Sequence, residues 1–312
     1  MEKFELFEKG SLGTCWYGKY HYLEPWAGCE HDCAYCYARH RGVVIDKLNE
    51  LNAVFNQPKL LTDLPGLLDK IRAGIAKNGV KILKLSRYTD FFSPSFVKNG
   101  TSAAVLETIC ETSAERVIIT TKGTPDENII KIMKKHCGKI SYNAAIKPEN
   151  RLNLEKGAPS SRERVEAAEK IAGAGIKTTI HMDPLILGLD DLKDMPVFFD
   201  DIKKRGLNRV MFSFLLLNEP ILDTVKTRID KKSLDTILEN FDMGTTRKYL
   251  PKQDETVLYS IKDEARKEYA EKLGEMLSRK GFDFVICSLK SNRGAAETRP
   301  SNCPACDGTF YA

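Results

Sequence analysis

The chain has 312 residues, of which 42% are hydrophobic and 29% are charged, a balance typical of a soluble globular protein. No apolar run is long enough to span a membrane and residues 1–5 lack the apolar core of an export signal, so we expect no membrane contact and a cytoplasmic location. The net charge of +5 suits an anionic substrate but is too weak to indicate nucleic-acid binding by itself.

The first residues divide into a lead-in and a strand. Residues 1–19 form a polar lead-in that contains Cys15. Residues 20–26 are rich in aromatic side chains, which favours a first strand. This strand ends at a loop that carries three cysteines.

The cysteine loop holds Cys29, Cys33 and Cys36. Thiolates are soft ligands that suit zinc, copper(I) or iron–sulfur clusters. Structural zinc needs four closed ligands, whereas three cysteines on one loop fit three irons of a [4Fe–4S] cluster whose fourth iron stays open. The alternative is a zinc knuckle completed by His31 or His40, which would make the protein a non-catalytic zinc-binding module.

Helices and strands then alternate as far as residue 218. Apolar residues recur at helical spacing over 61–78, and Gly79 closes this helix before a strand over 80–86. Ser160 and Glu163 form a capping box that starts a later helix, which runs to residue 173. The remaining expected elements are helices at 102–114, 126–136 and 190–204, and strands at 116–122, 139–146, 177–182 and 208–216.

Six strands with intervening helices require parallel pairing and right-handed crossovers. This pattern predicts an α/β fold, either a full or partial TIM-type barrel or a flat doubly wound sheet. The chemistry of a barrel lies at the C-terminal ends of its strands, and the cysteine loop follows the first strand at that end.

The alternation of strands and helices ends at residue 218, and we interpret residues 219–312 as a C-terminal α+β extension. Residues 219–260 are mixed and charged, residues 261–280 predict a helix with Glu–Lys pairing, and residues 282–286 predict a short strand. The predicted organisation is therefore a lead-in over 1–19, a barrel over 20–218 and this extension.

The extension carries a second group of cysteines. Cys303 and Cys306 enclose a proline in a C-x2-C pattern that is typical of half a metal knuckle. Together with Cys287, and with Cys15 as a fourth ligand, they are candidates for a second metal site. Iron–sulfur, zinc and unligated thiols all stay open.

The C-x3-C-x2-C spacing, with Tyr35 just before the last cysteine, resembles the radical S-adenosylmethionine (SAM) enzymes. In that family the open iron binds the amino and carboxylate groups of SAM, which is cleaved to a 5′-deoxyadenosyl radical that abstracts hydrogen from the substrate. The resemblance implies an open, partial (β/α)6 barrel and an electron donor such as flavodoxin or ferredoxin. It also implies that Tyr35 packs near the adenine.

The finer resemblance is to the spore photoproduct lyase-like (DNA repair photolyase-like) branch of this superfamily. It rests on the Cys-Tyr-Ala-Arg ending of the cysteine loop and on segments that follow four later strands. Those segments are residues 88–94, 121–122, 157–164 and 184–189.

This resemblance assigns roles to residues at the strand ends. Thr89 and Asp90 occupy the place where the family holds the SAM amino group. Lys122 sits where the branch uses a lysine on the SAM carboxylate, a sensible partner for a point charge. Asn143, with Ser141 as the alternative, is the polar residue that ends the fourth strand.

One departure from the branch bears on the substrate. The lyases carry a cysteine just ahead of the SAM-contacting segment, where this chain has Arg87 or Tyr88. This difference argues against thymine-dimer repair unless a tyrosine or a distant cysteine serves instead. Arg87 is a candidate for holding an anionic substrate, and His181, which ends the fifth strand, for substrate contact or proton transfer.

The sequence therefore predicts a radical SAM enzyme with a [4Fe–4S] cluster. We place a small molecule or a peptide ahead of nucleic acid as its substrate. The alternatives are a nucleic-acid lesion lyase of the spore photoproduct lyase type and the non-catalytic zinc module.

Overall fold

A computed structural model of the chain describes residues 3–9, 20–149, 152, 154–248, 257–286 and 310. Its main sheet has eight strands in the order β1-β2-β5-β6-β7-β8-β9-β12. All neighbours pair in parallel except β1 (Phe7–Lys9), which lies antiparallel to β2 (His21–Leu23) at one edge. The other strands are β5 (Ile82–Leu85), β6 (Arg116–Thr121), β7 (Ile140–Ala144), β8 (Lys177–Leu185), β9 (Arg209–Phe214) and β12 (Asp283–Ile286).

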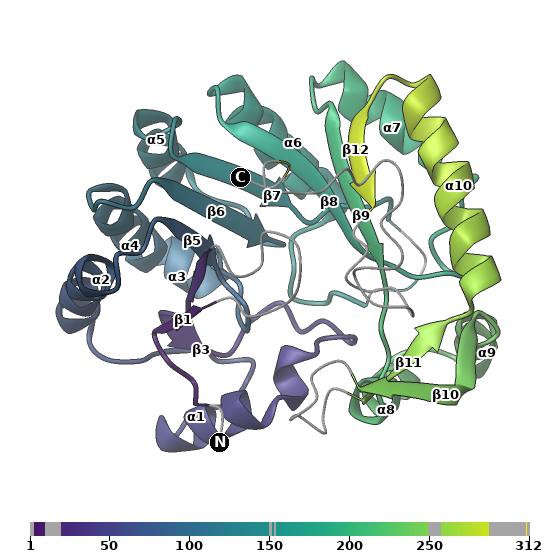
Figure 1. Ribbon diagram of the computed structural model, residues 1–312, viewed down its shortest axis with the longest axis horizontal. Coiled ribbons are helices and arrows are strands. Elements are labelled where there is room, and N and C mark those ends of the chain that lie inside the picture. The colour runs from purple at the N-terminus through teal and green to yellow at the C-terminus, as the bar shows by residue number, and fades with distance from the viewer. Residues whose placement is uncertain are drawn as a thin grey trace.

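Helices cover the outer side of this fan of strands (Figure 1). They are α2 (Leu64–Asn78), α4 (Thr101–Cys110), α5 (Glu127–Lys135), α6 (Ser161–Gly173), α7 (Met195–Lys204) and α10 (Asp263–Arg279). Within the described residues, the edge strands β1 and β12 each have a single neighbour in the sheet. The predicted α/β partial barrel is therefore confirmed.

The six predicted strands are all present, although the first is shorter than expected. It divides into β2 and a separate strand β3 (Trp26–Ala27), which pairs with β4 (Lys59–Leu60) in a small sheet of its own. Pro25 lies between the two pieces and has no backbone N–H to donate to a ladder. The chain therefore leaves the main sheet before it reaches the cysteine loop.

The helix starts follow local signals. Ser160 caps α6 by accepting the N–H of Glu163 at 3.2 Å, and the Glu163 carboxylate accepts the N–H of Ser160 at 2.7 Å, so the capping box is confirmed. Helix α7 starts at Met195 instead of residue 190, with Pro196 in its first turn.

The segment after β9 returns to the barrel. Helices α8 (Glu219–Lys226) and α9 (Lys231–Leu238) precede the hairpin of β10 (Phe241–Lys248) and β11 (Val257–Ile261). Helix α10 then leads into β12, which pairs with β9 from Asp283 opposite Arg209. Strand β12 is thus a seventh parallel strand, which the six-strand pattern did not predict. None of the described helices is both long and apolar enough to cross a membrane.

The two faces of the sheet have separate cores. The outer face packs under the helices in one large apolar cluster. On the inner face, Tyr20 and Tyr22 of the first strand region meet Ile118, Met211 and Val285 from later strands. We call these five residues the apolar plug. Because the plug fills the inner side of the sheet where they meet, the functional site is expected nearer the C-terminal ends of the strands.

Candidate active site

The cysteine loop is fixed to its surroundings through its backbone. The N–H of Cys29 donates to the carbonyl of Phe55 at 2.7 Å, and the N–H of Ala34 donates to the carbonyl of Leu154 at 2.8 Å. Gly28 has a φ of +92°, and a Cβ there would lie 2.6 Å from the Phe55 oxygen, so only glycine fits. The 3-10 turn Ala38–His40 and helix α1 (Gly42–Glu50) follow the loop.

The sulfur atoms lie in surroundings that suit cluster ligands. Burial raises the pKa of the Cys29 thiol, and the backbone N–H of His31 opposes this rise. Burial likewise raises the pKa of Cys36, which the backbone N–H groups of Arg39 and Ala38 oppose. N–H groups directed at sulfur stabilise a thiolate once a metal replaces its proton. The loop therefore fits a cluster held by thiolates.

The two histidines that would complete a zinc knuckle are engaged elsewhere. His31 Nε2 lies 3.2 Å from the Asp90 carboxylate, and His40 Nε2 lies 3.1 Å from the Thr224 hydroxyl. In the described part of the chain, no three His, Cys, Asp or Glu side chains are gathered around one metal position. Ligands of a single zinc all lie about 2.0–2.3 Å from it, whereas cluster cysteines bind separate irons.

Asp90 ties the cysteine loop to the end of β6. Its carboxylate accepts the N–H of Phe92 at 2.9 Å, the N–H of Lys122 at 2.7 Å and the hydroxyl of Thr121. Burial opposes ionisation, but His31, Thr121 and the Lys122 N–H together lower the pKa of Asp90 to about 2. The carboxylate is thus charged and held by protein groups, and its predicted contact with the SAM amino group stays a prediction.

Lys122 reaches from the end of β6 toward the same loop. Its Nζ lies 5.5 Å from the centre of the Tyr35 ring, within cation–π range. Burial would lower the pKa of Lys122, yet Cys33 and Glu155 raise it above its ordinary value. Lys122 is therefore a half-buried cation beside the middle cysteine.

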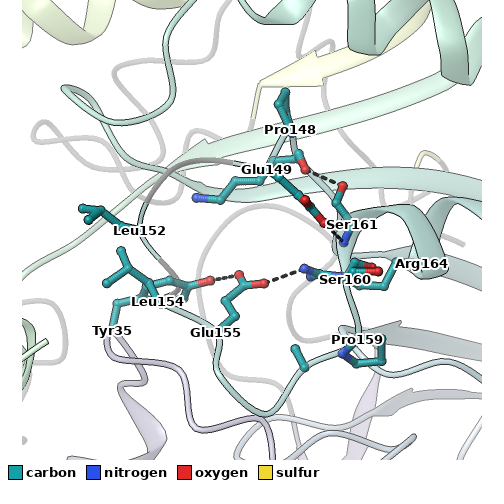
Figure 2. A pocket seen from close by; sticks show the side chains of 12 residues that line it. Tyr35, Pro148, Glu149, Leu152, Leu154, Glu155, Pro159, Ser160, Ser161 and Arg164 are labelled. Atoms are coloured by element: carbon teal, nitrogen blue, oxygen red, sulfur yellow. Dashed lines mark hydrogen bonds and ion pairs between the residues drawn. The ribbon is translucent and has the colours of Figure 1, made fainter. Parts of the chain in front are cut away.

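A pocket of about 330 Å³ opens next to Tyr35 (Figure 2). It is lined by Tyr35, Lys147, Pro148, Glu149, Leu152, Leu154, Glu155, Ala158, Pro159, Ser160, Ser161 and Arg164. The Tyr35 hydroxyl donates to Glu155, whose other carboxylate oxygen lies 2.8 Å from the Arg164 guanidinium. Arg164 also donates to the carbonyl of Ala145 at 2.7 Å. The wall of the pocket is a chain of mutually paired polar groups, in which Tyr35 and Arg164 are buried and Glu155 is partly buried.

Glu155 is the centre of this network. Burial opposes its ionisation, but Lys122, Arg164 and Lys147 together lower the pKa of its carboxyl to about 2. Sequence reasoning assigned no role to Glu155 or Lys147. No local pattern marks them, since Tyr35 and Lys122, which face Glu155, come from distant segments. The nearest signal was the capping box of α6, which places Arg164 in the first turns of that helix.

Thr89 follows β5, and Asn143 lies next to the last residue of β7; their contacts with SAM stay predictions. The Thr89 hydroxyl donates to the carbonyl of Gly28, which leads into the cysteine loop. Asn143 pairs in register with Thr120 and is 1% exposed, and among the described residues its amide oxygen and nitrogen have no hydrogen-bond partner. Ser141, the alternative, lies two residues earlier on the same face of β7.

Arg87 and Tyr88 lie beside the cysteine loop with internal partners. The Arg87 guanidinium forms an ion pair with Glu8 and lies 4.7 Å from the centre of the Tyr88 ring. The N–H groups of both residues donate to the buried carboxylate of Glu24. The Tyr37 hydroxyl donates to the carbonyl of Arg87. These contacts hold the segment in place and leave its catalytic role a prediction.

His181 lies on the inner face of β8, beside Asp183. Its Nε2 is 3.5 Å from the Asp183 carboxylate. The negative charge of Asp183 also helps to raise the pKa of Lys122. The four cysteines suggested for a second metal site fall outside the described residues. They are Cys15, Cys287, Cys303 and Cys306.

Residues 23–195 match the family model described as "Radical SAM superfamily". The chain belongs to the radical SAM superfamily. This family implies a [4Fe–4S] cluster and SAM, and the protein is therefore a radical SAM enzyme. A search of curated proteins gave no match.

Solved structures share the fold of this chain. A spore photoproduct lyase complexed with dinucleoside spore photoproduct has a TM-score of 0.62 at 17% identity, covering 85% of this chain and 75% of that one. Streptococcus suis SuiB bound to S-adenosylmethionine has a TM-score of 0.52 at 10% identity, covering 84% and 48%. At these identities the likeness establishes the fold, not the substrate.

Proposed function

We propose that this radical SAM enzyme binds its cluster through Cys29, Cys33 and Cys36 and binds SAM between that loop and the end of β6. One observation carries the proposal. Lys122 lies over the ring of Tyr35 and faces Cys33, so a half-buried cation and an aromatic ring meet beside the predicted cluster. A SAM carboxylate on the open iron would meet Lys122 there.

The pocket beside Tyr35 supports a place for the adenine. Its lining combines the Tyr35 ring with the apolar side chains of Leu152 and Leu154, which suits a flat heteroaromatic ring. Two of its polar members, Glu155 and Arg164, are already paired with each other. Asn143, which has no partner among the described residues, is the candidate for a hydrogen bond to the ribose or to a neighbouring group.

When bound, the cluster would supply the electron that cleaves SAM to methionine and a 5′-deoxyadenosyl radical, which takes a hydrogen atom from the substrate. The chain's own residues place SAM, exclude water and fix the cysteine loop. We propose a reduced flavodoxin or ferredoxin as the electron donor. Cys287, Cys303 and Cys306, with Cys15, stay a proposal for a second metal site, supported by their C-x2-C spacing.

We rank a small molecule or a peptide ahead of nucleic acid as substrate. Arg87 and Tyr88 stand where the lyases carry a hydrogen-returning cysteine, and both have internal partners. The shared fold keeps a nucleic-acid lesion as the second candidate, because the neighbouring lyase structure holds a dinucleoside photoproduct.

The test is SAM cleavage by the anaerobically reconstituted protein with dithionite. We expect 5′-deoxyadenosine from the wild type and none from a variant with Cys29, Cys33 and Cys36 changed to alanine. Cys137→Ala is the matched control, since Cys137 is exposed and lies away from the loop. Cleavage that survives in the triple variant would exclude this loop as the cluster site.

A further inference from the structure

The inner face of the sheet changes from apolar to polar side chains toward the C-terminal ends of the strands. At the level of the apolar plug, Ile118 of β6 and Met211 of β9 point inward and touch residues from across the sheet. Two residues further along, the inward positions are Thr120 and Ser213, and Asn143 pairs in register with Thr120. We call Thr120, Asn143 and Ser213 the polar layer.

The side-chain polar atoms of this layer are buried without partners. Asn143 and Ser213 are each 1% exposed. Within the described part of the chain, the Thr120 hydroxyl, the Ser213 hydroxyl and both polar atoms of the Asn143 amide have no hydrogen-bond partner. Buried polar groups in folded proteins almost always have partners, because leaving them unpaired costs stability. Three such side chains at one level are therefore groups that a ligand would complete.

The layer lies between the apolar plug and the SAM position. Lys122, the proposed partner of the SAM carboxylate, follows Thr120 by two residues and lies just past the C-terminal end of β6. The plug closes the other side with Tyr22, Ile118 and Met211. A molecule held by the layer would therefore face the SAM position across a short distance along the strands.

We infer that the polar layer is the substrate's binding floor and that the substrate is a small, neutral, polyhydroxylated molecule such as a sugar or cyclic polyol. This inference rests on the proposed function. Hydroxyls and a carboxamide each donate and accept without carrying charge, and the hydroxyls of a polyol do the same.

Other substrate classes fit the layer less well. A nucleobase would need an aromatic face for stacking, and the layer has none. An anion would need a surplus of cations at the layer. Lys84, on the inner face of β5, has its Nζ 5.9 Å from the centre of the Tyr22 ring in the plug, and Lys122 is faced by the carboxylates of Glu155 and Asp183. Asn143 is the member of the layer with both a donor and an acceptor on its side chain, so it can contact the substrate and SAM at once.

The first test measures thermal unfolding of the cluster-free protein, and so does not depend on catalysis. Thr120→Val and Ser213→Ala remove hydroxyls without partners, so both variants should melt at a higher temperature than the wild type. Thr178→Val is the matched control. Thr178 is buried on the opposite face of the sheet and donates to the carbonyl of Ile176 at 2.9 Å, so its loss should lower the melting temperature. A lower melting temperature for Thr120→Val and Ser213→Ala would show that their hydroxyls have structural partners, and would overturn the inference.

The second test uses the reconstituted holoenzyme with SAM and dithionite. Separate reactions contain perdeuterated D-glucose, D-ribose or myo-inositol, a perdeuterated peptide digest, or perdeuterated DNA. We expect deuterium in 5′-deoxyadenosine from at least one sugar or polyol and from neither macromolecular probe. Thr120→Val should lower this transfer at least tenfold, and Thr178→Val should not.

The outcomes separate the two claims. If the wild type forms 5′-deoxyadenosine that carries no deuterium, or takes deuterium only from peptides or DNA, the substrate inference is overturned and the proposed function stands. If the wild type forms no 5′-deoxyadenosine, the proposed function fails and the inference fails with it.

Discussion

Arg228 donates two hydrogen bonds to Asp32, at 3.0 and 3.1 Å, although 196 residues separate them in the chain. Asp32 lies inside the cysteine loop, between Cys29 and Cys33, in a left-handed conformation with φ of +46°. The Arg39 guanidinium forms an ion pair with the same carboxylate, with an N–O distance of 2.6 Å. The segment between α8 and α9 thus fastens the loop that binds the predicted cluster.

Arg228→Met should loosen the cysteine loop. Charged hydrogen bonds to a partly buried carboxylate contribute about 1–2 kcal/mol, so the free energy of unfolding should fall by about that amount. Iron should also leave the reconstituted variant several-fold faster in the presence of a chelator. Lys226→Met, which removes an exposed partner of Asp223, is the control. Equal rates of iron loss in Arg228→Met and the wild type would mean that the contact does not hold the loop.

Lys122→Met should weaken SAM binding. Losing one charge-assisted hydrogen bond to the SAM carboxylate corresponds to roughly a 10- to 100-fold rise in Kd. Equilibrium binding of SAM to the reconstituted protein measures it. Lys131→Met, an exposed lysine on α5, should bind like the wild type. Unchanged affinity in Lys122→Met would remove Lys122 from the SAM site.

Glu155→Gln should be strongly destabilising. The substitution leaves the buried Arg164 guanidinium without its carboxylate partner, which costs about 3 kcal/mol or more. Chemical denaturation checks it, with Glu166→Gln as the control because Glu166 pairs with Arg162 at the exposed surface of α6. If Glu155→Gln lost no more stability than Glu166→Gln, the pocket wall would not depend on this ion pair.

Glu24 should make stability fall with rising pH. Burial raises the pKa of its carboxyl to about 8, above the value of 4.5 that is ordinary for a glutamate and expected in the unfolded chain. Between these values the folded state keeps a proton that the unfolded state has lost, so unfolding becomes easier by up to about 1.4 kcal/mol per pH unit. Above about pH 8 this contribution levels off.

Glu24→Gln tests this dependence, because glutamine does not titrate and still accepts a hydrogen bond. As the pH falls from 8 to 5, the free energy of unfolding of the wild type should rise relative to that of Glu24→Gln. Glu111→Gln, an exposed change, should show no such trend. Parallel stability curves for the wild type and Glu24→Gln would place the pKa of Glu24 near its ordinary value.

The local elements were largely predictable from the sequence. The capping box of Ser160 and Glu163 depends only on neighbouring residues, and β-branched runs mark the buried strands. The break at Pro25 is a local effect that the aromatic content of residues 20–26 concealed. By contrast, β12 pairs with β9, which is distant in the sequence, and nothing in residues 282–286 indicates which strand they pair with.

The site was predictable where the family pattern is local, as in the cysteine loop. It was not predictable where side chains meet through the fold. Glu155 and Arg228 lie 120 and 196 residues from their partners Tyr35 and Asp32, and each is an ordinary charged residue in the sequence. Likewise, Thr120 and Ser213 become notable only once the sheet buries them without partners.

The most direct measurement of the central claim is the iron content and electron paramagnetic resonance of the anaerobically reconstituted, reduced protein, with and without SAM. The account predicts one [4Fe–4S] cluster, about four irons per chain, at Cys29, Cys33 and Cys36, with a signal that shifts when SAM binds the open iron. The variant lacking the three cysteines should lose these four irons and the SAM-dependent shift, and any iron that remains would belong to a second site. A SAM-dependent shift that persists in the variant, or a wild-type cluster whose signal ignores SAM, would contradict the account.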